Sequence, residues 1–188
     1  MLDIYATSID YDPSEEASQR FFATVQNKMH WAAHGNTAAE IVHARADASR
    51  PNMGMTNWLG EKPRKDEAAI AKNYLKPEEL DVLNRIVNLY LEFAELQALN
   101  RKPMTMQNWI AKLDEYLRLS EREILQHAGK ISHDEALQKA ELEFEKYRAG
   151  QLAQTSRVER DFEEAIKKLP AKPPRKKSSA PKKPGKKK

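Results

Sequence analysis

Three histidines lie close together in the first quarter of the chain and are the residues best suited to chemistry. His30 and His34 are four residues apart, which places them on one face of any helix that runs through both, and His43 follows them. Imidazole can transfer a proton near neutral pH or bind a metal ion. A metal site needs further ligands, and the residue after His30 is Trp31, so that the HExxH pattern is absent. We therefore predict no metal site. The alternative is that the histidines form a polar helix edge and that one of them caps a helix.

The segment after His34 predicts a corner between two helices. Gly35 and Asn36 suit a left-handed turn, and Thr37 with Glu40 forms a capping box that starts a new helix. The first N–H groups of a helix are unpaired and attract anions. We therefore predict a phosphate-binding turn at Gly35, Asn36 and Thr37, with His30 as a base that takes a proton from an attacking hydroxyl. The alternative, which the residues alone favour, is an ordinary helix corner without a ligand.

The elements that position this corner are predicted to be helices. Six glycines in 188 residues, with many Ala, Leu, Glu and Lys, indicate an all-α fold. An extended segment is expected over residues 1–11, and no helix is expected over residues 53–65. Capping residues and apolar spacing predict helices that begin at Asp12-Pro13 (ending at Gly35), Thr37 (to Ala48), Glu67 (to Leu75), Pro77 (the longest), Thr105, Ser120 (closed by Gly129), Ser132 (closed by Gly150) and Ser156.

Charge divides the chain into a body and a tail. The formal net charge is +4, but residues 170–188 hold nine basic residues and no acidic one, which leaves residues 1–169 at −5. The tail also holds five of the ten prolines and no large apolar residue, so we predict that residues 170–188 are disordered. Nonspecific nucleic-acid binding through this tail is one expected role, and a merely solubilising tail is the other.

Several classes of protein are excluded by composition. The chain has no cysteine, which rules out a disulfide framework, a zinc ribbon and a thiol nucleophile. No run of about 18 apolar residues and no secretory signal pattern is present, so we expect a cytoplasmic protein without membrane contact.

The corner resembles the active-site loop of the Fic/Doc family, in which the order is His-Pro-Phe-x-Asp/Glu-Gly-Asn-Gly-Arg. Here the segment 30–38 reads HWAAHGNTA, which keeps His30, Gly35 and Asn36 at the family's spacing. The resemblance implies a Fic/Doc-like helical bundle, His30 as general base, and ATP or another nucleotide held at Gly35, Asn36 and Thr37. It also implies a nucleotidyl- or phosphotransferase that modifies a protein hydroxyl.

Parts of that loop differ from the family pattern. His34 stands where the family has its acidic magnesium ligand, and Thr37 and Ala38 replace the glycine and the arginine. Magnesium prefers oxygen ligands, so it is not expected here. The lost arginine removes a bidentate phosphate ligand, for which Arg45 is the candidate replacement.

A wider resemblance covers about three quarters of the chain. The chain is similar to the bacterial RhuM family, often labelled RhuM/Fic/Doc, which is associated with virulence and mobile elements. Members are usually longer and begin with a phage-type DNA-binding module, so we expect this chain to be a short form, a fragment or an internal start. The resemblance rests on the runs 4–13 (IYATSIDYDP), 21–41 (FFATVQNKMHWAAHGNTAAEI), 45–58 (RADASRPNMGMTNW), 71–75 (AKNYL), 83–101 (LNRIVNLYLEFAELQALNR) and 109–133 (WIAKLDEYLRLSEREILQHAGKISH).

Two functions follow from these resemblances. The first is a Fic-like, toxin-like enzyme with a degenerate motif, and the second is a non-catalytic interaction module associated with DNA-binding proteins.

Further candidate pocket residues, polar or aromatic and placed in turns or at helix ends, are His34, Arg45, Asn52, Trp58, Lys72 and Asn73.

Overall fold

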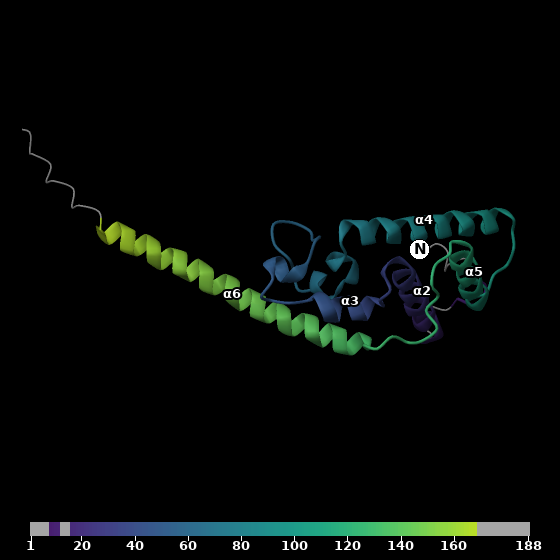
Figure 1. The fold of residues 1–188 in the computed structure, drawn as a ribbon, viewed down its shortest axis with the longest axis horizontal. Helices are drawn as coiled ribbons and strands as arrows, with labels where there is room; N and C mark the ends of the chain where they lie inside the picture. Colours follow the sequence, from purple (N-terminus) through teal and green to yellow (C-terminus); the bar gives the residue numbers. More distant parts are fainter. Residues whose placement is uncertain (1–7, 12–15, 169–188) are drawn as a thin grey trace, which may run out of the picture. The chain divides into compact units, whose positions relative to one another are not determined.

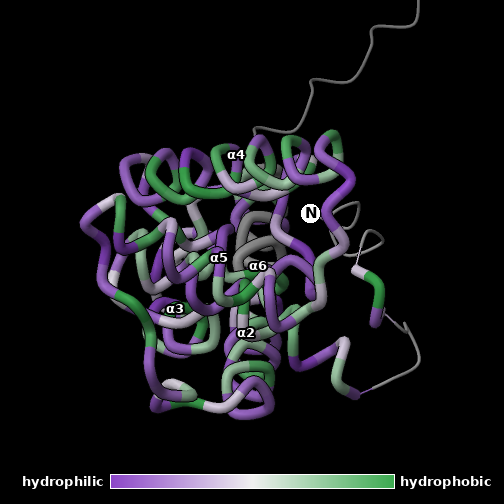
Figure 2. The backbone as a smooth tube through the Cα atoms, turned by 90° about the vertical axis from the view of Figure 1, so that its right-hand side faces the viewer, coloured by the Kyte–Doolittle hydropathy of each residue, from purple (hydrophilic) through white to green (hydrophobic). Residues whose placement is uncertain are grey.

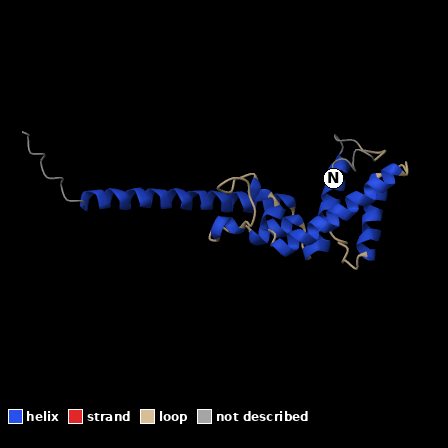
Figure 3. Ribbon diagram, turned by 90° about the horizontal axis from the view of Figure 1, so that it is seen from above, coloured by secondary structure: helices blue, strands red, loops and turns tan. Residues whose placement is uncertain are grey.

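The computed structural model describes residues 8–11 and 16–168 (Figure 1). These residues form α-helices, loops and short 3₁₀ turns, and they contain no strand (Figure 3). The predicted all-α class is therefore confirmed for the described part of the chain. The predicted helix start at Asp12-Pro13 and the predicted disordered tail lie outside it. By its internal contacts the chain divides into two units, residues 1–149 and residues 150–188.

Helices α2 (Glu16–His34) and α3 (Ala38–Arg45) form the predicted corner. Gly35 adopts a φ of +74°, the left-handed conformation that ends α2. The Thr37–Glu40 capping box is present and starts α3, which ends at Arg45 rather than near Ala48. The apolar stripe of α2, which includes Val25 and Met29, is buried.

The chain between α3 and α4 (Pro77–Leu99) is built from three 3₁₀ turns. These are η1 (Pro51–Gly54), η2 (Glu67–Ala69) and η3 (Ala71–Tyr74). The predicted helix over residues 67–75 is wrong, because the extended backbone of Ile70 separates η2 from η3. The carbonyl of Asn73 accepts the amide of Thr56 at 2.7 Å, which ties η3 to a distant loop.

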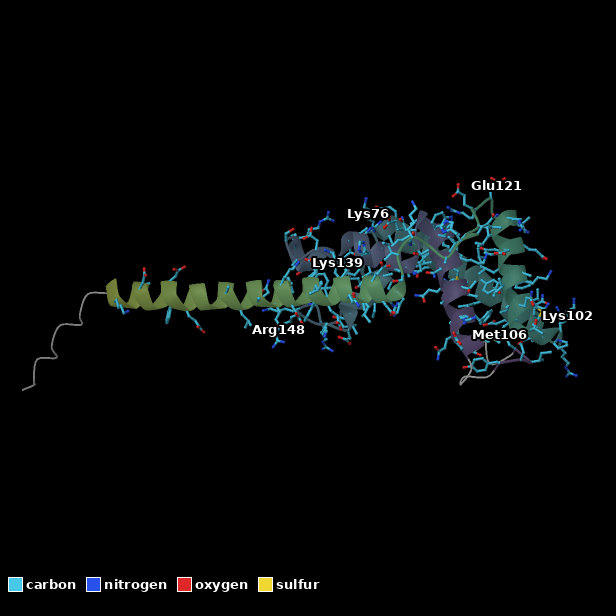
Figure 4. The ribbon with its side chains drawn as sticks, turned by 90° about the horizontal axis from the view of Figure 1, so that it is seen from below. Lys76, Lys102, Met106, Glu121, Lys139 and Arg148 are labelled. Atoms are coloured by element: carbon cyan, nitrogen blue, oxygen red, sulfur yellow. The ribbon has the colours of Figure 1, made fainter. Side chains whose placement is uncertain are left out.

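Helices α4 and α5 (Met106–Leu119) cover α2. The buried stripe of α4 includes Tyr90, whose hydroxyl donates to the Trp109 carbonyl at 2.6 Å and so joins α4 to α5. In Figure 2 hydrophobic and hydrophilic residues alternate along α4, as an amphipathic helix requires. Lys102 lies in the turn between α4 and α5, and Met106 is the first residue of α5 (Figure 4). The predicted starts at Pro77 and Thr105 are confirmed.

Residues 120–132 form a loop, so the helix predicted from Ser120 to Gly129 is wrong. Glu121, at the end of α5 in Figure 4, has a φ of 55°, which turns the chain away from the helix. The Lys28 ammonium donates to the Leu125 carbonyl at 3.1 Å, and the Lys130 amide donates to Glu40 at 2.8 Å. These contacts with α2 and α3 stabilise residues 120–132 as a loop.

Helix α6 (His133–Lys168) is the longest helix, rather than α4. Its predicted start is confirmed by hydrogen bonds between Ser132 and Glu135. The predicted stop at Gly150 and the predicted new start at Ser156 are wrong, because the helix continues through both. A glycine inside a helix costs only about 1 kcal/mol, and no proline follows before residue 170.

The two units divide α6 between them. In the first unit Ala136 and Ala140 are buried, whereas Leu152 and Phe162 in the second unit are each 64% exposed. No helix among the described residues is both long enough and apolar enough to cross a membrane.

Candidate functional site

His30 is buried in the last part of α2, with 4% of its surface exposed. Its Nδ1 lies 2.9 Å from Nε2 of His34, so the two imidazoles share one hydrogen bond. His43 is exposed on α3. Among the described residues no three His, Asp or Glu side chains come together in a group that suits a metal ion.

The buried imidazole of His30 and the half-buried imidazole of His34 are both neutral at neutral pH. Burial, with a smaller contribution from His34, lowers the pKa of His30 from 6.5 to about 4. Burial also lowers the pKa of His34, although Glu79 partly opposes this shift. A neutral imidazole can accept a proton, but a pKa this low makes it a weak base.

Two of the three amides predicted to bind phosphate, those of Gly35 and Thr37, are already paired, and so is the amide of Ala38. The Thr37 amide donates to Glu40 Oε2 at 2.8 Å, and the Ala38 amide donates to Asn27 Oδ1 at 3.2 Å. The Gly35 amide donates to the Trp31 carbonyl at 2.7 Å. A phosphate would have to displace Glu40 and Asn27 to reach the Thr37 and Ala38 amides, and the phosphate site at Gly35, Asn36 and Thr37 stays a prediction.

The Glu40 carboxylate also joins the corner to the loop 120–132. Its Oε2 accepts the Thr37 amide and its Oε1 accepts the Lys130 amide, each at 2.8 Å. Gly129 lies against Thr37, where an added Cβ would be 2.9 Å from the Thr37 methyl group. One acidic side chain therefore closes the start of α3 and fixes the loop beside it.

Arg45 is bound within the fold, so its guanidinium is not free for the phosphate-binding role predicted for it. Its guanidinium makes two hydrogen bonds with the Glu79 carboxylate, each 2.6 Å long, and a third with the Tyr74 carbonyl at 2.8 Å. The Arg45 hydrogen bonds are the largest cause that lowers the pKa of Glu79, to about 2. This arginine joins α3, η3 and α4, which is a structural role.

A cavity of about 710 Å³ adjoins the corner, and His30 forms part of its wall. Ligand clefts in proteins have volumes of about 300–1,000 Å³ and are mainly apolar with a few polar groups. The wall combines apolar side chains, among them Phe22, Met29, Val42, Leu83 and Val87, with the polar residues Gln26, Asn27, His30, Thr37, Lys72, Ser132 and His133.

The structure brings some of the predicted pocket residues to this cavity and leaves others elsewhere. His30, Thr37 and Lys72 line it. The other predicted residues are not in its wall. Asn52 has a left-handed backbone in η1, Trp58 packs on the core, and the buried Asn73 side chain donates to the Glu67 carbonyl.

Two residues at the corner were not predicted as site residues. The capping-box pattern predicts a contact between Glu40 and Thr37, but it gives no sign of the contact with Lys130. Asn27, eleven residues before Ala38, has no local sequence signal that relates it to the turn.

Comparison with known proteins identifies the family. The chain matches the model of the Virulence protein RhuM family over residues 1–155. Neither a curated protein nor a solved structure matches it significantly, so the Fic/Doc-like character of the fold stays a prediction. The cavity, both histidines and the whole α2–α3 corner lie within the matched residues. The chain therefore belongs to the Virulence protein RhuM family.

Proposed function

We propose that this chain is a binding protein whose site is the cavity beside the α2–α3 corner. The observation that carries the proposal is a buried, neutral histidine in the wall of a mainly apolar cavity of about 710 Å³. Buried polar groups cost free energy unless they find a partner, and a bound ligand supplies one.

The ligand proposed is a nucleotide or a related phosphate compound. The apolar wall suits a flat ring or another apolar portion, and the exposed residues Lys72 and His133 lie at the rim of the same cavity. A lysine at the rim favours an anionic group outside the cavity. Phosphate at the rim requires no change in the pairing of Thr37 with Glu40.

Thermal unfolding with ATP tests this proposal. A ligand that binds only the folded state raises its melting temperature, so we expect a rise at ATP concentrations well above Kd. Ala39→Phe, which fills part of the cavity, should abolish the rise. Ala111→Phe, at an exposed position of α5 outside the cavity wall, should retain it. The absence of a shift with ATP, AMP and adenosine would contradict a nucleotide ligand.

Transfer to a protein hydroxyl is the second candidate, because a neutral His30 can accept a proton, although its low pKa makes it a weak base. In that reaction the hydroxyl oxygen attacks the α-phosphorus of ATP, its proton passes to His30, and pyrophosphate leaves. The paired amides of Thr37 and Ala38 argue against it, because the turn offers little stabilisation to the phosphates. Pyrophosphate release that is lost in His30→Ala would support transfer, whereas binding without release would support a non-catalytic protein.

We also propose protein partners for a non-catalytic module. Leu89, Leu96 and Leu99 on α4 are each more than half exposed, which is unusual for large apolar side chains that lie close together on one helix. Substituting all three by Gln should leave the melting temperature nearly unchanged and abolish co-purification of a specific partner.

A further inference from the structure

The outward face of α4 carries large apolar side chains that lie outside the core. Leu89, Leu96 and Leu99 are 55%, 53% and 80% exposed. Tyr90 and the other buried residues of α4 lie on the opposite face of the helix and pack into the core. Figures 1 and 2 show α4 along one edge of the first unit, with no other described element of that unit beyond it.

The three leucines belong to a longer seam whose steps alternate between three and four residues. This spacing is typical of helices that pack side by side with knobs in holes. One member of the seam is partly buried against the core and the others are exposed, so no described helix packs on it. The seam residues are Val82, Arg85, Leu89, Glu92, Leu96 and Leu99.

The seam can pair with a second copy of itself in the antiparallel direction. A twofold axis beside the midpoint of the seam, halfway between Leu89 and Glu92, would bring every seam residue opposite a seam residue of the second copy. A twofold interface requires this self-complementarity. The facing pairs are then Val82 with Leu99, Arg85 with Leu96, and Leu89 with Glu92.

The two charges in the seam favour the antiparallel direction. In that arrangement Arg85 lies one helical turn from Glu92 of the second copy, and the twofold axis repeats the contact. In a parallel pair in register, each arginine would face an arginine and each glutamate a glutamate, which is unfavourable. Among the described residues Glu92 has no ion pair, and Arg85 pairs with the exposed Asp81 of its own helix, so both can contact a second copy.

We propose that the outward face of α4 binds a second copy of this chain as an antiparallel pair of α4 helices. The inference names the partner of the leucine face and rests on the protein-binding role proposed for it. Stable interfaces bury about 1,200–2,000 Å² in total, and one pair of helices lies at the low end of that range. The dimer is therefore weak, and the charged residues in its seam fix the register at a cost in stability.

Sedimentation velocity of the purified full chain, from about 1 μM to about 500 μM, tests the proposal. We expect a change from monomer to dimer over this range. Arg85→Glu brings like charges together and should weaken dimerisation about tenfold or more, and so should Glu92→Arg. The double variant Arg85→Glu/Glu92→Arg exchanges the two charges and should recover most of the loss, whereas a parallel pair would gain nothing from the exchange.

The controls separate the interface from the fold. Arg118→Glu, at an exposed position of α5, is the matched charge reversal and should dimerise as the wild type does. Since the substituted residues are all exposed, the melting temperatures at low protein concentration should stay near that of the wild type. Unchanged dimerisation in both single variants, or no recovery in the double variant, would overturn the antiparallel α4 pair.

Failure of this inference is distinguishable from failure of the proposed protein partner. A wild type that stays monomeric up to about 500 μM would overturn the second copy as the partner. Co-purification with the variant that replaces the three leucines by Gln would then still decide whether this face binds a different protein.

Discussion

Glu79 joins α3 to the start of α4. It binds the Arg45 guanidinium through both oxygens and also accepts the Lys76 amide at the start of α4. Hydrogen bonds from Arg45 are the main reason that its pKa is lowered to about 2. The sequence indicates a charged residue near the start of α4 but not its partner, because Arg45 is 34 positions away.

Glu79→Gln should destabilise the protein by about 1–3 kcal/mol at pH 7, since it leaves a half-buried arginine without its counter-charge. The folded-state pKa lies below the ordinary value, so this contribution is fully present above about pH 4.5 and is lost as the pH falls toward 2. Urea unfolding at several pH values should show the difference between wild type and variant shrinking over that range.

Asp81→Asn is the matched control for Glu79→Gln. Asp81 pairs with Arg85 on the exposed side of α4, where solvent screens the ion pair and it contributes little to stability. A loss in Asp81→Asn as large as that in Glu79→Gln would contradict a special role for the Arg45 contact.

Gly129 is required where the loop meets the corner. Its φ is +91°, and a Cβ would lie 2.9 Å from the Thr37 methyl group. Gly129→Ala should therefore cost about 1–3 kcal/mol in thermal or urea unfolding. Gly35→Ala separates strain from contact, because Gly35 also has a positive φ but has no atom within 4 Å of the added carbon. Equal losses in the two variants would show that the contact with Thr37 contributes nothing.

At the scale of elements, local signals predicted starts better than ends. The capping boxes at Thr37 and Ser132 and the start at Thr105 are confirmed, since a cap depends on residues within one turn. Ser120 with Glu123 has the same pattern, yet Lys28 and Glu40 hold the following loop open from 90 or more positions away. Such contacts depend on the assembled fold and leave no local pattern.

The candidate site shows the same difference between features set by neighbouring residues and features set by distant ones. The turn at Gly35 and the start of α3 follow from residue types, and both could be predicted. The occupation of the turn's amides by Asn27 and Glu40, and the cavity beside them, could not be predicted, because both arise from packing between distant segments.

The continuity of α6 gives a prediction for that element. An added Cβ at Gly150 would meet no atom within 4 Å, so Gly150→Ala relieves only the conformational cost of glycine. Circular dichroism should show increased helix content, with a gain of about 0.5–1 kcal/mol in that helix. Gly150→Pro should divide the helix, and unchanged helix content in Gly150→Pro would contradict a continuous α6.

At the scale of the whole molecule, charge is distributed very unevenly along the chain. Residues 170–188 carry nine basic residues, while the rest has a net charge of −5. The site described above lies entirely within the residues that match the RhuM family. The proposed nucleic-acid binding through the tail is therefore separable from the proposed ligand binding.

The full chain should bind duplex DNA with an affinity that falls steeply as salt rises. Deletion of residues 170–188 should abolish this binding without changing the melting temperature of the body. Fluorescence anisotropy at several salt concentrations measures this. A full-length variant with the nine basic residues replaced by Gln is the matched control and should behave as the deletion does. Persistent DNA binding by both proteins would place the contact on the body instead.

The double contact of Glu40 links the start of α3 to the loop 120–132. Any anion that reached the Thr37 amide would take the place of Glu40, and the segment around Lys130 would lose its anchor at the same time. Binding of such an anion would then be detected as faster amide exchange or new protease cleavage in the loop between α5 and α6. A ligand that does not displace Glu40 would leave that segment unchanged, so amide exchange and cleavage in the neighbouring loop would show where in the site the ligand binds.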